Sequence, residues 1–186
     1  MPVPFGDTTG NVGPMGTTVT VERQVAATPA TVWALVSDVE RMGEFSPETT
    51  GCEWVGEQRG PVVGARFRGR NRFGSRQWQT SCRVVGSEPG RLFAFEVTAA
   101  GLRVARWEYH VEAAGDGTRL VETWIDQRGR LAALVGGMVT GVGDRETHNR
   151  DGMVATLDRV AEVAEAAEAA GPAGPAGPAG AVPPPA

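Results

Sequence analysis

The fold of this chain is decided by the stretch at residues 144–169, DRETHNRDGMVATLDRVAEVAEAAEA. Its apolar residues Met153, Leu157, Val160, Ala164 and Ala167 recur at alternating spacings of four and three. This spacing predicts one apolar stripe along one side of an amphipathic helix. At ~1.5 Å per residue the helix is on the order of 40 Å long. A helix of that length needs a broad apolar surface to lie on.

The segments upstream of this helix have the two-residue period of β-strands. Turn signals such as Phe73-Gly74-Ser75 and Gly115-Asp116-Gly117 separate them, and links this short join antiparallel neighbours. The expected strands are residues 17–25, 51–56, 65–73, 76–86, 92–98, 102–112 and 118–127. Between the first two, Thr28-Pro29 predicts a helix start, and Asp38 is expected to cap a short second helix that ends at Ser46-Pro47.

One face of the predicted sheet is aromatic and the other is charged. Phe67, Trp78, Phe95 and Trp107 fall on the apolar side of their strands. Arg66, Arg68, Arg70 and Arg72 alternate along one strand, and we expect an outer row paired with carboxylates such as Glu96, Glu108 or Glu112. A docking patch for an acidic protein or an anionic lipid surface is the alternative. The strand at residues 118–127 is ambiguous, because Leu120 and Trp124 oppose Val121 and Ile125.

Composition predicts one domain with tails. The domain is expected at residues 17–169, between a flexible segment at residues 1–16 and a disordered tail at residues 170–186 in which Gly-Pro-Ala repeats. With 22 acidic and 18 basic residues the chain is mildly acidic, which argues against nucleic-acid binding. Since no signal peptide or membrane-spanning stretch is evident, we expect a cytoplasmic protein without integral membrane association. The sequence leaves its oligomeric state open.

Residues that could carry chemistry are few and scattered. His148 lies ~140° from the helical stripe, so we expect it to face solvent. His110 falls on the polar face of its strand with Arg106 and Glu108. Cys52 and Cys82 are expected to be buried free thiols on strands too far apart to bridge. No close-spaced pair of ligands suggests a metal site, and we predict neither a metal nor a cofactor.

Several short motifs are similar to those of the START-like, or SRPBCC, superfamily, in particular its bacterial polyketide cyclase/dehydrase and lipid-transport members. They are ATPATVW at residues 27–33, SDVERM at 37–42, FSPE at 45–48, VGARF at 63–67, EPGR at 88–91 and GTR at 117–119. The resemblance covers roughly residues 17–168. It implies an α+β helix-grip fold, in which a seven-stranded antiparallel sheet curls around the long C-terminal helix and encloses an apolar cavity. It carries no catalytic motif onto particular residues of this chain.

Three functions remain open at this point. The first is binding or transport of a hydrophobic small molecule, such as a lipid, isoprenoid or polyketide; the second is a polyketide cyclase or dehydratase; the third is a protein-interaction module that uses the Arg row. The sequence does not decide whether the protein is an enzyme. The residues expected to line a cavity are Phe45, Trp54, Phe67, Trp78, Phe93, Phe95, Trp107, Tyr109, Met138, Glu146, Asn149 and Met153.

Two features of this cavity stay undecided. The aromatic face could equally be packed core. Asn149 and Glu146 lie ~40° and ~20° from Met153 on the helix, so they could hold the polar end of a ligand, or this first turn could project into water. The Gly-rich segment at residues 128–143, which includes a predicted short helix near residues 131–135, is either a lid or a plain connector.

Overall fold

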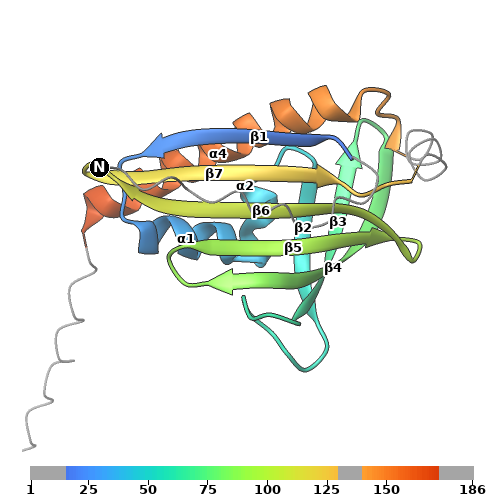
Figure 1. Cartoon of the computed structure of the whole chain (residues 1–186), viewed down its shortest axis with the longest axis horizontal. Helices are drawn as coiled ribbons and strands as arrows, with labels where there is room; N and C mark the ends of the chain where they lie inside the picture. The colour runs from blue at the N-terminus through green and yellow to red at the C-terminus, as the bar shows by residue number, and fades with distance from the viewer. Residues whose placement is uncertain (1–15, 130–139, 172–186) are drawn as a thin grey trace, which may run out of the picture.

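The computed structural model describes residues 16–129 and 140–171, and within them the chain forms one antiparallel sheet of seven strands with helices on its concave side (Figure 1). In chain order the elements are β1 (Thr18–Val25), α1 (Pro29–Ser37), η1 (Val39–Arg41), α2 (Met42–Phe45), β2 (Thr49–Val55), β3 (Arg66–Phe73), β4 (Arg76–Glu88), β5 (Leu92–Ala99), β6 (Leu102–Ala114), β7 (Gly117–Asp126) and α4 (Arg145–Ala170). The strand order is β1-β7-β6-β5-β4-β3-β2. The predicted helix-grip fold and meander are confirmed.

The sheet bends strongly, and this bend makes room for a cavity. Register shifts interrupt the pairing between Thr49 and Gly51, between Val84 and Gly86, and near Val97. Such bulges bend and twist a strand. As a result β2 and β3 run steeply across the direction of β5, β6 and β7 (Figure 1). The sheet therefore curls around the N-terminal half of α4.

The C-terminal half of α4 is fixed against the start of the chain. The Glu168 carboxylate accepts hydrogen bonds from the backbone N–H of Thr28, at 2.8 Å, and from the Thr31 hydroxyl, at 2.7 Å. Glu165 accepts from the backbone N–H of Ala26 at 3.0 Å. Thr28 also caps α1, with Pro29 in its first turn, as the sequence predicts.

The C-terminal half of α4 also packs its apolar side chains into the hydrophobic core. Leu157, Val160, Ala161 and Ala164 are at most 1% exposed, and they belong to one apolar cluster with β1, α1 and β7. The predicted stripe is therefore buried as far as Ala164, whereas its last residue, Ala167, is exposed. Toward its N-terminus the same helix lies over a hollow instead, which is described below.

The Arg row is on the outer surface, as predicted. The Arg68 and Arg70 side chains are 48% and 53% exposed. Their carboxylate partner differs from the prediction, because both lie near Glu53 of the neighbouring β2, at 3.7 and 3.8 Å. Glu108 instead pairs with Arg106 and His110 within its own strand, as it sits two residues from each.

Several predictions concern residues outside the described ranges. These are Met138 as a cavity residue, the short helix near residues 131–135, the lid or connector over most of residues 128–143, the segment before residue 16, and the tail after residue 171. In the part of the chain that is described, no helix is both long and apolar enough to cross a membrane.

Candidate functional site

A cavity of about 920 Å³ lies between the N-terminal half of α4 and the concave face of the sheet. Its walls come from β2 to β7, from the segment that leads into β2, and from the first turns of α4. Apolar atoms make up most of the lining surface, although close to half of the lining residues have polar side chains. A cavity of this size and character is typical of sites that bury a small organic molecule. The concave face of the sheet is thus packed at one end and hollow at the other.

The residues predicted for the cavity divide into three groups. Those that line it are Phe67, Trp78, Phe95, Trp107, Tyr109, Asn149 and Met153. Those that are described but do not line it are Phe45, Trp54, Phe93 and Glu146. Met138 lies outside the described residues.

The residues that do not line the cavity support it or face away from it. Phe93 is fully buried in the packed end of the sheet, and Trp54 packs edge-on against Phe67 with ring centroids 5.6 Å apart. Phe45, the last residue of α2, is buried in the apolar core. Glu146 is exposed and lies 3.7 Å from Arg150, one helical turn along. A two-residue period identifies the face of a strand, but it does not indicate which part of that face is hollow.

The prediction that His148 faces solvent is wrong. Its side chain is 24% exposed, it lines the cavity, and its ring packs edge-on against Phe73 at 4.7 Å between centroids. Measured around the helix axis from Met153, Asn149 lies at ~40°, Arg145 at ~80° and His148 at ~140°, all on the same side. Because β2 and β3 curl around the first turns of α4, that part of the helix is buried over a wider arc than the stripe alone indicates.

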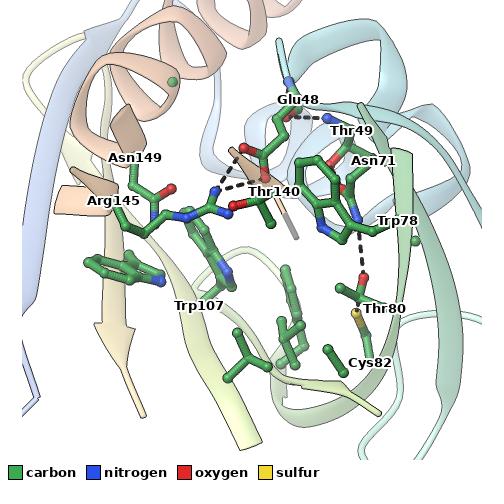
Figure 2. Close-up of a pocket in the computed structure, with 18 of the residues that line it drawn as sticks. Glu48, Thr49, Asn71, Trp78, Thr80, Cys82, Trp107, Thr140, Arg145 and Asn149 are labelled. Carbon is green, nitrogen blue, oxygen red and sulfur yellow. Dashed lines mark hydrogen bonds and ion pairs between the residues drawn. The ribbon is translucent and has the colours of Figure 1, made fainter. Parts of the chain in front are cut away.

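A polar cluster ties the first turn of α4 to the segment before β2. The Glu48 carboxylate accepts a hydrogen bond from Arg145 Nη1 at 2.8 Å and lies 2.7 Å from His148 Nε2. The Arg145 guanidinium also lies over the Trp78 ring, 5.9 Å from its centroid. Figure 2 shows Glu48, Arg145, Asn149 and Trp78 facing the same space. The cluster holds this end of α4 in place, much as Glu168 holds the other end.

A buried carboxyl and phenol form a second polar group, of which sequence reasoning found Tyr109 but missed Glu122. On β7 the inward residues are Leu120, Glu122 and Trp124, with Glu122 only 2% exposed. Glu122 pairs directly with Tyr109 of β6, whose hydroxyl donates a hydrogen bond to Glu122 Oε1 at 2.8 Å. Glu122 Oε2 has no hydrogen-bond partner among the described residues. Both residues line the cavity.

The surroundings of this pair keep the Glu122 carboxyl neutral. Burial raises its pKa to about 8, although the hydrogen bond from Tyr109 acts in the opposite direction. Burial also raises the pKa of Tyr109, and the neighbouring carboxyl raises it further. The pair therefore has both of its protons at neutral pH. The register of the β6–β7 hairpin, set by its turn at Gly115-Asp116, is the signal that could have found it.

The two cysteines line the cavity but are poor nucleophiles. Cys52 and Cys82 are free and buried, as predicted. Burial raises the pKa of Cys52 to about 11 and that of Cys82 to about 12, so both remain protonated thiols at neutral pH. Among the described residues, no group of three or more His, Cys, Asp or Glu side chains could hold a metal ion.

The comparisons with known proteins agree on the fold. A family model described as polyketide cyclase / dehydrase and lipid transport matches residues 16–165. A polyketide cyclase-like protein, Cgl2372 from Corynebacterium glutamicum, is 32% identical over 81% of this chain and 93% of its own, with a TM-score of 0.55. No curated protein matches the chain.

Two more distant structures share the fold alone. The di-domain aromatase/cyclase StfQ of the steffimycin biosynthetic pathway is 16% identical over 84% of this chain and 52% of its own, with a TM-score of 0.66. Major latex-like protein 151 from Panax ginseng is 11% identical over 81% of this chain and 98% of its own, with a TM-score of 0.61. The family match supports a hydrophobic ligand-binding fold, and these two structures add only the shared fold.

Proposed function

Because this chain belongs to the polyketide cyclase/dehydrase and lipid transport family, we propose that it binds a hydrophobic small molecule, such as a lipid, isoprenoid or polyketide, in the cavity beneath α4. The observation that carries the proposal is the cavity of about 920 Å³ with its mainly apolar lining. A packed core leaves few voids larger than a water molecule, so a hollow of this size needs a reason. Binding of a ligand supplies one.

The polar groups of the site suit a binder. Arg145 is paired with Glu48, and Arg128 is paired with Asp126 at 2.7 Å, so neither guanidinium is free to attract an anionic substrate. Cys52 and Cys82 are protonated thiols. What remains is a cavity whose surface is mainly apolar, with polar side chains such as Asn71 and Asn149 that could orient a bound molecule.

The test is ligand binding with a matched pair of variants on β4. Cys82 faces the cavity, whereas its neighbour Ser81 is exposed on the outer face. Cys82→Phe should fill part of the cavity and weaken binding of 1-aminoanthracene, followed by its fluorescence, while Ser81→Phe should leave the affinity unchanged. Native mass spectrometry of the purified protein should also reveal a co-purified hydrophobic molecule. Absence of any binding by the wild-type protein would refute the proposal.

A second candidate is an enzyme of the cyclase or dehydratase type. It is favoured by one observation, the neutral carboxyl of Glu122 beside the Tyr109 hydroxyl in an apolar cavity. Such a carboxyl can donate a proton to a substrate oxygen. The two functions differ in what becomes of the molecule bound. Recovery of the co-purified molecule unchanged after long incubation supports a binder, and conversion that is lost in Glu122→Gln supports an enzyme.

A further inference from the structure

The Tyr109–Glu122 pair contains one more polar hydrogen than its own hydrogen bond uses. A neutral carboxyl and a phenol have two such hydrogens between them. One lies in the bond from Tyr109 to Glu122 Oε1, at 2.8 Å. The other then belongs to Glu122 Oε2, which has no partner among the described residues. A buried donor without a partner is costly, so this hydrogen calls for an acceptor.

The neutral state of Glu122 follows from its position as well as from its burial. It is 2% exposed, and no ion pair joins it to any cation in the described ranges. Three arginines line the cavity in the described part of the chain: Arg128 and Arg145 are engaged by Asp126 and Glu48, and Arg103 is exposed to solvent. An unpaired buried charge costs far more than a neutral carboxyl, so the group keeps its proton.

We propose that the Tyr109–Glu122 pair is a recognition site for an uncharged acceptor oxygen, of the ketone or ester carbonyl type, on an otherwise apolar ligand. This inference rests on the proposed function, and it adds the chemical class of the ligand. Glu122 Oε2 donates the hydrogen bond, and the apolar lining around it, including Phe95 and Trp107, covers the rest of the molecule. The pair itself offers no positive charge, so it is not suited to an anionic end of a ligand.

The test compares three ligands that share one frame. They are 2-acetylanthracene, which carries a ketone; 2-isopropenylanthracene, in which a methylene group replaces the ketone oxygen; and 2-(aminomethyl)anthracene, which is cationic. The wild-type protein should bind the ketone about tenfold more tightly than the hydrocarbon, as one good hydrogen bond implies. Tighter binding of the amine would mean that Glu122 acts as an anion and would overturn the inference.

Variants at position 122 identify the donor. Glu122→Leu should remove the preference for the ketone while the hydrocarbon still binds. Glu122→Gln should restore a smaller preference, because its amide N–H donates from the same place. Glu108→Gln is the matched control: Glu108 is on the outer face of the adjacent β6, paired with Arg106 and His110, so the preference should not change.

A second measurement does not depend on any variant. The infrared C=O stretch of carbonyl-¹³C 2-acetylanthracene should move to lower frequency on binding to the wild-type protein, as expected for a carbonyl that accepts a strong hydrogen bond. Equal affinity for ketone and hydrocarbon, with no infrared shift, would overturn the inference and leave the proposed function intact. If none of the three anthracenes binds, both fail.

Discussion

The buried carboxyl of Glu122 should make this protein less stable as the pH rises from 5 to 8. Its pKa is about 8 in the folded protein, against 4.5 for an ordinary glutamate. Since the folded-state pKa is the higher one, the stabilisation is fully present below pH 4.5 and is lost as the pH rises toward 8. Between these values the folded state binds about one proton more than the unfolded state, so the free energy of unfolding falls by about 1.4 kcal/mol per pH unit. From pH 5 to pH 7 the loss is about 2.5 kcal/mol.

Glu122→Gln removes this dependence, because its amide does not titrate in this range yet still accepts the hydrogen bond from Tyr109. The assay is urea denaturation of both proteins at intervals between pH 5 and pH 8, with the two free energies subtracted. Ordinary titration of the remaining groups cancels in this difference. Tyr109 and the two cysteines have raised pKa values, so they stay protonated throughout. Parallel curves for the two proteins would refute the argument, since they would mean that Glu122 is already ionised in the folded state.

Three further predictions concern α4. Leu157→Ala should cost ~2–5 kcal/mol in urea denaturation, because Leu157 is 1% exposed in the packed half of the helix; an unchanged midpoint would contradict that packing. Gly152→Ala should stabilise the protein by about 1 kcal/mol, as Gly152 is inside the helix and an added Cβ meets its nearest neighbour at an ordinary 3.7 Å; a lower melting temperature would show that the site cannot accept it. Glu48→Gln should speed amide hydrogen exchange in the first turn of α4, because Arg145 loses its charged partner; the exposed Glu44→Gln serves as the control, and equal exchange in both variants would contradict the role of Glu48.

Much of the fold was predictable because its signals are local. The stripe from Met153 to Ala164 predicts the long helix, and Thr28-Pro29 marks the start of α1. Alternation predicts which face turns inward along the strands other than residues 118–127. Turn residues such as Gly115-Asp116 separate the strands and make neighbours antiparallel. These signals depend only on residues close in the chain, so periodicity and turn chemistry are enough to read them.

The cavity was predictable only in part, because it depends on how the sheet bends. The sequence placed Phe93 and Phe95 on one face, but the bend of the sheet at the bulges in β2, β4 and β6 decides that Phe95 lines the hollow while Phe93 lies in the packed end. The same curvature brings His148 inside, although its position on an isolated helix indicates solvent.

Glu122 shows most clearly the difference between what the sequence predicts and what only the tertiary structure decides. Alternation along residues 118–127 left two faces open, and a glutamate is an ordinary residue for an outer face. The pairing of β7 with β6 on one side and β1 on the other turns it inward, opposite Tyr109. By itself the sequence determined the elements, their order and the apolar stripe on which the fold is built. The tertiary structure alone decided where the space lies and which polar groups face it, because both depend on contacts between strands distant in the chain.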